Sequence, residues 1–562
     1  MYNWDRTNFL PHVSLAWSPK GQGLISRLFG GNGQSVVRGG FAMLNDYFGE
    51  QIATFFDERN QLGFSSKTTI NANTYNVGCG HYVVVGNAMS SCTPNLGPLF
   101  TGFNQVVRSL PGITVPGDLT FPQQKPLRTS FGSDLPTAIE SSLDSKLSTP
   151  RNYAWSVTYE RQLLKGAVLQ VSYLARLGRN LLAQRDIATP ANLFDPKSGM
   201  DWYTAATILE RARQAGAALA SIQPIPYFEN LFQPYLVARA AACPTCQNAT
   251  QAVYQRAQRL GNDWTTIQLN MDPYSTIGPH AFYQPQYGAL TSWTTLANSN
   301  YHALAVSLRE RLRTFTVDFN YTYSHSLDDA SGLQAAGAYS SSALILNPLR
   351  QRDNYTASDF DVRHIINVNS VWQLPFGRGR TFVPRAGGLL DALIGGWQLS
   401  GIFRWNTGLP LGTPIDANTW STNWENQSET TLIQPVPVSG CPDRRSPPKF
   451  LGNCDVTAIY RSFRNSYPGE TGQRNYFRFP GYTNVDLGLA KSWTMPYNED
   501  HKLQLRWDVF NVANYQPFGT LIGGRSGWGI LPGSVNPAPN FSNFSKIQGT
   551  PRVMQVGLRY AF

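Results

Sequence analysis

The 562-residue sequence has little charge and no long uninterrupted apolar run. Charged residues make up 14% of the chain, against about 25% in typical soluble domains. A membrane-spanning helix needs about 18 or more consecutive apolar residues, and no stretch of that kind is present. The composition therefore argues against a helical membrane protein and is also unusual for a soluble one.

Two further features are missing. The start of the chain, MYNWDRTNFLPHVSLAW, lacks the basic stretch and the apolar stretch that make up a secretory signal. A soluble chain of this length is expected to divide into about four domains of roughly 150 residues, with linkers between them. No shift in composition marks such a linker. We therefore expect one domain over residues 1–562.

Strict alternation of apolar and polar residues is the main pattern that the sequence contains. In TFTVDFNYTYS, residues 314–324, every apolar side chain falls on one side and every polar one on the other. A period of two predicts β-strands rather than helices. The same pattern occurs at 152–160, 484–490, 502–509 and 551–562, with further candidates near 9–17, 34–46, 167–176, 301–310, 362–374 and 396–405. The sequence thus predicts about eleven strands.

Strand length and side-chain chemistry distinguish two kinds of β fold. Strands of soluble proteins average about 5–6 residues, whereas a tilted strand needs about 9–11 residues to cross a bilayer. Most runs here belong to the longer class. Their polar sides carry Asp, Arg, Glu and Asn, which suit a wet lumen, and Tyr and Trp cap their apolar sides. We predict an all-β fold, an antiparallel transmembrane β-barrel; a soluble all-β protein is the alternative.

The links between the predicted strands alternate in length. Those after the strands at 153, 301 and 485 are brief, whereas the others are long, at roughly 47–151, 177–300, 325–361, 406–481 and 512–551. Outer-membrane barrels have short periplasmic turns and long extracellular loops. We therefore expect large loop insertions in one barrel domain, chiefly at 47–151, 177–300 and 406–481. The terminal Phe562 is then expected at the periplasmic rim, where the assembly machinery can recognise it.

Several pieces of the chain, taken in order, resemble a known family. They are NFLPHVSLAWSP, VVRGGFAMLNDYF, NYAWSVTYERQL, NYHALAVSLRERL, YTYSHSLDD, DFDVRHIINVNSVWQLPFGRG, WDVFNVANYQPFG and VGLRYAF. Together they resemble the C-terminal half of Oar-like TonB-dependent outer-membrane receptors of the acidobacterial type. The resemblance implies about 11–12 strands of a barrel of about 22 strands in the bacterial outer membrane.

The resemblance also implies a function and partners. Receptors of this family take up a bulky solute, here expected to be a carbohydrate or a peptide, with energy from the TonB–ExbB–ExbD complex. The barrel assembly machinery, membrane lipid and lipopolysaccharide are further expected partners. The family's signal peptide, regulatory-like domain, plug and TonB box are expected upstream of Met1, so the chain resembles a fragment. The alternatives are about twelve strands closed into a smaller pore, a passive channel or surface-binding protein, and a soluble all-β carbohydrate binder.

Six cysteines fall in three local pairs within the long links. The pairs are Cys79 with Cys92, Cys243 with Cys246, and Cys441 with Cys454. An even number with close spacing predicts three disulfides formed in the periplasm. The CPTC motif at 243–246 is also compatible with half of a zinc site or a redox motif. Zinc would need two more ligands, and His81 and His302 are distant in sequence, so we favour structural disulfides.

The long links offer two places for ligand recognition. Within 177–300, DWYTAATILERARQAGAALA and ATQAVYQRAQRLGNDW have helical periodicity, which predicts a compact two-helix lid or a loop that grips a ligand. In ANTWSTNWENQSETT, Trp420 and Trp424 are surrounded by Asn, Ser and Thr. They are candidate ligand-binding residues for a sugar, whose rings stack on aromatic side chains; a solvated loop with aromatic anchors is the alternative.

Catalysis and nucleic-acid binding find little support. His325 or His364 could act with Asp328 or Asp329 and a serine, but SHSLDD and DVRH lie in or beside predicted strands. The sequence has neither a G-x-S-x-G elbow nor a phosphate-binding glycine loop. The net charge of +11 is scattered rather than gathered in a basic stripe. We expect no enzymatic activity, no cofactor, no metal and no nucleic-acid partner.

Overall fold

The computed structural model describes residues 8–20, 29–30, 33–45, 81–85, 88–93, 139–163, 166–283, 289–332, 344–416, 428–495 and 497–562. The chain forms two compact units, one of Met1–Asp46 with Arg128–Phe562 and the other of Tyr47–Leu127. In the second unit, the described residues form an antiparallel hairpin of β3 (His81–Val85) and β4 (Ala88–Thr93). No helix among the described residues has both the length and the apolar character needed to span a bilayer.

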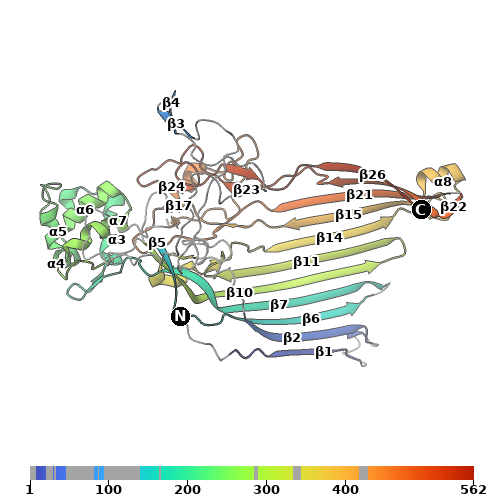
Figure 1. Cartoon of the computed structure of the whole chain (residues 1–562), viewed down its shortest axis with the longest axis horizontal. Coiled ribbons are helices and arrows are strands. Elements are labelled where there is room, and N and C mark those ends of the chain that lie inside the picture. The colour runs from blue at the N-terminus through green and yellow to red at the C-terminus, as the bar shows by residue number, and fades with distance from the viewer. Residues whose placement is uncertain are drawn as a thin grey trace, which may run out of the picture. The chain divides into compact units, whose positions relative to one another are not determined.

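The main unit is built on one large antiparallel sheet whose principal strands follow the order of the chain (Figure 1). In sheet order these eleven strands are β1 (His12–Trp17), β2 (Ser35–Asn45), β6 (Arg151–Gln162), β7 (Val168–Asp186), β10 (Ala289–Arg311), β11 (Phe315–Asp328), β14 (His364–Gln373), β15 (Trp397–Asn406), β21 (Tyr482–Met495), β22 (Asn498–Phe510) and β26 (Val553–Ala561). Three short strands pair beside this path: β5 (Ile139–Leu143), β12 (Leu344–Ile345) and β13 (Thr356–Ala357). All eleven regions predicted from alternation overlap one of the principal strands, so this prediction is confirmed.

The strand register gathers most of the apolar residues of the principal strands on one face of the sheet, with exceptions such as Leu174, Ile365 and Ile402. Trp507 lies opposite Leu489 on one side and Val556 on the other. The next residues along the strands form rows on the other face, such as Asn320, Asn367, Arg404 and Asn484. Because side chains alternate along a strand, this register gives one continuous apolar face and one polar face.

The apolar face is open. Val556 is 70% exposed, Leu558 is 69% exposed and Trp507 is 45% exposed. The principal strands form a single layer in Figure 1, so within the described residues no second sheet is packed on this face. A soluble protein would cover a surface of this size with protein. Lipid is the medium in which an exposed apolar sheet face is stable, and the paired strands satisfy the backbone hydrogen bonds there.

Aromatic side chains gather near both ends of the apolar face. At one end, the rings of Tyr323 and His364 have centroids 5.0 Å apart. At the other end, the rings of Tyr560 and Phe562 are stacked with centroids 6.0 Å apart. Aromatic rings in two bands are typical of the two interfaces of a membrane barrel.

The links alternate between short and long, as predicted. At one end of the sheet, the strands are joined by residues 18–34, 163–167, 312–314, 374–396 and 496–497. At the other end, they are joined by residues 46–150, 187–288, 329–363, 407–481 and 511–552. We call these the short-link end and the long-link end. The short link 374–396 contains helix α8 (Gly388–Ile394).

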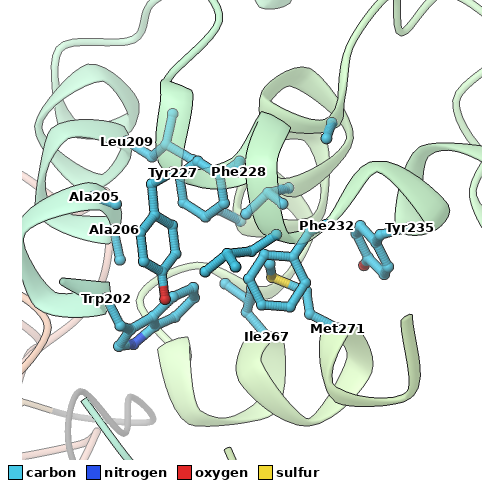
Figure 2. Close-up of a cluster of buried hydrophobic side chains, with 14 of the residues drawn as sticks. Trp202, Ala205, Ala206, Leu209, Tyr227, Phe228, Phe232, Tyr235, Ile267 and Met271 are labelled. Atoms are coloured by element: carbon cyan, nitrogen blue, oxygen red, sulfur yellow. The ribbon is translucent and has the colours of Figure 1, made fainter. Parts of the chain in front are cut away.

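The link after β7 folds into a helical lobe with its own core (Figure 2). Its elements are β8 (Phe194–Asp195), β9 (Met200–Asp201), α3 (Trp202–Gln214), η3 (Leu219–Ser221), α4 (Pro226–Leu231), α5 (Gln233–Ala238), α6 (Ala249–Leu260), α7 (Trp264–Met271) and η4 (Asp272–Tyr274). Helices α3 and α6 match the two that the sequence predicts, and α4, α5 and α7 were missed. Figure 2 shows Trp202, Tyr227, Phe228 and Phe232 pointing toward one another between these helices.

A second core lies in the links 407–481 and 511–552, which form what we call the aromatic lobe. Its elements are β16 (Pro410–Leu411), β17 (Ile415–Asp416), β18 (Thr431–Leu432), α9 (Val456–Arg461), β19 (Phe463–Arg464), β20 (Phe477–Arg478), β23 (Phe518–Leu521), β24 (Gly529–Ile530) and β25 (Phe544–Ile547). Its buried residues are Val436, Phe450, Leu451, Ile459, Tyr460, Phe463, Phe477, Trp528, Ile530, Phe541 and Phe544. Most of the buried apolar side chains of the described chain thus lie in the two lobes, while the large sheet keeps its apolar face outside.

Candidate ligand-binding site

A cavity of about 370 Å³ lies at the long-link end of the sheet. It is formed where the end of β11 meets the helical turn η6 (Pro348–Asn354), strand β16 and residues 471–475. The side chains that give it its chemical character are Asp329, Asp353, Asn354, Asp359, Glu429, Arg474 and Asn475. The cavity is therefore lined by four carboxyl groups, two amides and one guanidinium.

Arg474 connects three parts of the chain at this cavity. Its Nη2 donates to Asp328 Oδ1 at 2.7 Å and to Asp359 Oδ1 at 3.1 Å. Its Nη1 donates to the backbone carbonyl of Asn354 at 3.2 Å. Burial alone would lower the pKa of Arg474, but the two carboxylates raise it above its ordinary value. The guanidinium is thus already neutralised by protein groups.

Glu429 is the most strongly perturbed acid at the cavity. Burial raises its pKa from 4.5 to about 8, so the carboxyl is largely neutral at pH 7. Its Oε2 is buried and has no hydrogen-bond partner among the described residues. The side chain reaches its place because Gly412 has no Cβ, which would clash with Glu429 Oε1. A buried polar atom of this kind calls for a hydrogen-bond partner.

Two other acids of the cavity are shifted in the same direction. Burial raises the pKa of Asp353 and of Asp329, although Asn298 N donates to Asp329 Oδ2 at 2.7 Å. The cavity therefore combines carboxyl groups that hold protons readily with carboxylates and amides. Such groups bind hydroxyl, amino or guanidino groups of a solute better than they bind an anion.

An ion-pair cluster beside the cavity fixes the start of β14. Asp361 is nearly fully buried and forms an ion pair with Arg363 Nε at 3.2 Å. It accepts hydrogen bonds from Ser326 N at 2.7 Å and from Arg478 Nη2. His325 Nδ1 lies 3.3 Å from Asp361 Oδ1. Burial would raise the pKa of Asp361, but the Ser326 N–H and the Arg478 guanidinium lower it below its ordinary value. Arg478 thus fastens the long link 407–481 to the sheet, as Arg474 does.

The histidines considered for catalysis serve these structural contacts. Among the described residues, the ring of His325 bonds Asp361 and Arg363 and no serine hydroxyl. His364 Nδ1 lies 2.9 Å from the hydroxyl of Tyr321. Asp328 ends β11 and is buried against Arg474, because the long links cover that end of the strand. The described residues contain no cluster of three or more His, Cys, Asp or Glu suited to a metal ion.

The segment with Trp420 and Trp424 lies outside the described residues, whereas the residues on either side of it are described. Asp416 N donates to the carbonyl of Ser428 at 2.8 Å, so the described residues on either side of 417–427 are bonded to each other. The neighbours of these two residues, Ile415 and Glu429, both line the cavity. The described residues that flank the candidate sugar-binding segment in the sequence therefore lie at the wall of the cavity.

Two of the three predicted cysteine pairs lie among the residues that the structure describes. The structure contains a disulfide between Cys243 and Cys246 in the helical lobe, and one between Cys441 and Cys454 in the aromatic lobe. Cys79 and the side chain of Cys92 lie outside what the structure describes. His302, considered above as a distant zinc ligand, accepts or donates a hydrogen bond with the Tyr173 hydroxyl at 2.8 Å.

Sequence reasoning named Asp329, as a possible partner of a catalytic histidine, but missed the other charged residues that line the cavity. Glu429, Arg474 and Arg478 lie in a link where no strand pattern was recognised. The signal was nevertheless present in QRNYFRF, residues 473–479, where Arg474 and Arg478 alternate with aromatic residues at strand spacing. Two arginines four positions apart, in a chain with scarce charge, indicate fixed acidic partners, although the structure has a turn at 474–475 and a strand only at Phe477–Arg478.

Comparisons with known proteins place the chain in a family. Residues 1–555 match the outer membrane beta barrel domain. A search of curated proteins finds no match. Among solved structures, the outer membrane transporter YddB from Escherichia coli is similar at 8% identity and a TM-score of 0.36, over 94% of this chain and 39% of that chain.

Two receptors are similar at the same level. The siderophore receptor PirA from Acinetobacter baumannii has 8% identity and a TM-score of 0.34, over 99% of this chain and 41% of that chain. The ferric-catecholate import receptor Fiu from E. coli has 6% identity and a TM-score of 0.29, over 94% of this chain and 33% of that chain. The chain spans less than half of the length of each of these three structures. At such TM-scores the likeness carries no argument, and the assignment stands on the family match. The chain belongs to the outer membrane beta barrel domain family and is located in the outer membrane.

Proposed function

We propose that this chain is the barrel part of an outer-membrane receptor of the Oar-like, TonB-dependent type, which captures a bulky polar solute at its long-link end. The observation that carries the proposal is the cavity between β11, η6 and residues 471–475, at the end of the sheet where outer-membrane barrels have their extracellular loops. Uptake is then energised by TonB with ExbB and ExbD in the full-length receptor. The barrel assembly machinery and lipopolysaccharide are the corresponding membrane partners.

The chemistry of the cavity supports a neutral or cationic solute rich in hydroxyl or amino groups. The only guanidinium that lines it, within the described residues, is paired with Asp328 and Asp359. Glu429 contributes a neutral carboxyl with an unpartnered oxygen, which can accept from or donate to a solute hydroxyl. Trp420 and Trp424, which lie between Asp416 and Ser428 in the sequence, are proposed to stack on sugar rings.

The proposal is tested by binding measurements on the purified chain in detergent micelles. The probes are chitosan oligomers, maltodextrins and oligogalacturonates, which are cationic, neutral and anionic sugars of similar size. We expect the cationic or neutral oligomers to bind, and Trp420→Ala/Trp424→Ala together with Glu429→Gln to weaken their binding. Arg445→Ala, in the same link but in an exposed pair with Asp443, is the matched control and should leave binding unchanged. Preferential binding of oligogalacturonates would contradict the proposed solute class.

Energy coupling is tested separately in cells that carry the full-length receptor. Uptake of the bound oligomer is expected to stop when tonB is deleted, because the energised mechanism depends on that protein. Uptake that continues unchanged without TonB would identify a passive channel. Binding without any uptake would identify a surface-binding protein.

A further inference from the structure

Helix α8, in the short link 374–396, exposes its apolar side. Leu389 is 87% exposed and Leu393 is 71% exposed, one helical turn apart, and Leu390 beside them is 46% exposed. The polar residue of the helix points the other way, because Asp391 Oδ1 accepts a hydrogen bond from Arg378 N at 2.5 Å. In a soluble protein the leucines of such a helix would face the core.

This orientation is fixed by bonds to the strands. Trp493 Nε1 donates to the carbonyl of Ala392 at 2.8 Å, and Trp397 Nε1 donates to the carbonyl of Leu393 at 2.8 Å. Lys491 Nζ donates to the carbonyl of Gly395 at 2.5 Å. Three side chains of β15 and β21 thus satisfy the carbonyl groups that a helix leaves free at its C-terminus. The leucines are held outward by the same bonds.

The helix lies against the apolar face of the sheet. Lys491 and Trp493 continue the alternation of Leu487 and Leu489 in β21, so all four side chains are on that face. Trp397 is directly opposite Lys491 in the neighbouring strand. Figure 1 shows α8 beside the ends of the strands near the C-terminus. The exposed leucines are therefore continuous with the surface that lipid covers.

The rest of the link is basic and also exposes apolar groups. It contains three arginines, Arg378, Arg380 and Arg385, against one acid, Asp391. Phe382 is 53% exposed and stacks on Phe376 with ring centroids 5.4 Å apart. Exposed apolar side chains next to basic ones are typical of segments that lie at a membrane interface.

We propose that the link 374–396 is an interfacial anchor whose partner is the glycerophospholipid of the periplasmic leaflet. Leu389, Leu393 and Phe382 enter the boundary between headgroups and acyl chains. The arginines contact lipid phosphates, to which guanidinium groups bind strongly. The anchor fixes the depth of this rim of the sheet in the membrane and is independent of the solute proposed above.

The test places an environment-sensitive fluorophore on Leu389→Cys in the full chain, refolded into vesicles of phosphatidylethanolamine and phosphatidylglycerol. Lipids with a nitroxide near the headgroup should quench most of its fluorescence, and aqueous iodide should quench little. Val237→Cys, on α5 of the helical lobe and 76% exposed, is the matched control and should show the reverse. The unsubstituted chain gives the background from its six native cysteines.

Two outcomes would overturn the proposal. Strong iodide quenching at Leu389 without nitroxide quenching would place the helix in water. Protection from both quenchers would place it against protein, such as a second copy of the chain. Leu393→Cys provides a second position if Leu389→Cys does not fold, as judged by heat-dependent mobility on gels. Arg378→Gln/Arg385→Gln should reduce the nitroxide quenching at Leu389 in phosphatidylglycerol vesicles, and an unchanged signal would remove the phosphate contact from the proposal.

Discussion

Arg474 and Asp328 are 146 positions apart in the sequence, and a guanidinium nitrogen of the first donates to a carboxylate oxygen of the second at 2.7 Å. Arg474 belongs to the link between β15 and β21, and Asp328 ends β11. Both side chains are mostly buried, at 18% and 4% exposure. This pair therefore fastens the link that carries the candidate cavity to the rim of the sheet.

Arg474→Ala is expected to loosen the cavity wall. Removal of one partner leaves the buried carboxylate of Asp328 without its cation, which costs about 3 kcal/mol in comparable buried pairs. Hydrogen exchange of the backbone amides of residues 471–475 in detergent micelles should become faster, while exchange in the strands should not change. Arg445→Ala, in the same link, should have no measurable effect because its pair with Asp443 is solvent-exposed. Unchanged exchange in Arg474→Ala would show that the aromatic lobe holds the link without this pair.

Glu429 is expected to make the stability of the aromatic lobe depend on pH. Its pKa is about 8 in the fold and about 4.5 in the unfolded chain, so between these values the folded state holds the extra proton. Stability therefore decreases as the pH rises from about 4.5 to about 8 and is constant above that range. Glu429→Gln should remove this decrease, as measured by urea unfolding of the lobe at a series of pH values.

Glu470 lies in the same link as Glu429 and serves as the control, because its pKa is shifted in the opposite direction. Burial would raise its pKa, but Arg464 and the N–H of Tyr467 lower it below the ordinary value. The stability that the Glu470 carboxylate contributes to the fold is present at neutral pH and is lost as the pH falls through the lowered pKa. Glu470→Gln should therefore leave the decrease between about 4.5 and 8 in place. A wild-type lobe with constant stability over that range would contradict the assignment to Glu429.

The sheet could be predicted from the sequence because each strand carries its own signal. In β11 every apolar residue from Phe315 to Tyr323 falls on one face, and this local pattern survives without knowledge of any partner strand. The short links, which join neighbouring strands, follow directly from it. The missed helices α4 and α5 have only six residues each and begin next to Pro226 and Pro234, so they offer little periodicity to detect.

The cavity could not be predicted because its residues meet only through the tertiary structure. Asp329, Glu429 and Arg474 come from two different links, and no spacing in the sequence connects them. The raised pKa of Glu429 depends on burial by residues such as Gly412, which the sequence does not identify as neighbours. The segment with Trp420 and Trp424 was recognised by composition, but only the structure shows that Ile415 and Glu429, near its two ends in the sequence, line the cavity.

Charge on the two faces of β26 should have opposite consequences. Val556 is 70% exposed on the apolar face opposite Trp507, and Gln555 is on the polar face opposite Asp508. Val556→Arg places a cation in lipid and is expected to cost about 2–4 kcal/mol of unfolding free energy near the bilayer centre. Gln555→Arg should change stability little, because it meets water and Asp508. The measurement is urea unfolding in phospholipid vesicles, and equal costs for the two variants would contradict the assignment of the faces.

The two disulfides present in the structure should differ in their contribution to stability. Cys441 and Cys454 are 13 positions apart and pack against the core of the aromatic lobe, so their bridge restricts a sizeable loop of the unfolded chain. The loop-closure model gives about 3 kcal/mol for such a bridge. Cys243 and Cys246 are 3 positions apart, and the same model gives about 1 kcal/mol less for them.

Cys441→Ser/Cys454→Ser should therefore lower the urea midpoint of the aromatic lobe. Cys243→Ser/Cys246→Ser should lower the urea midpoint of the helical lobe by a smaller amount. Because each variant leaves the other lobe intact, the unaffected lobe serves as the internal reference. An unchanged midpoint in the Cys441 variant would mean that the aromatic core, rather than the bridge, closes this loop.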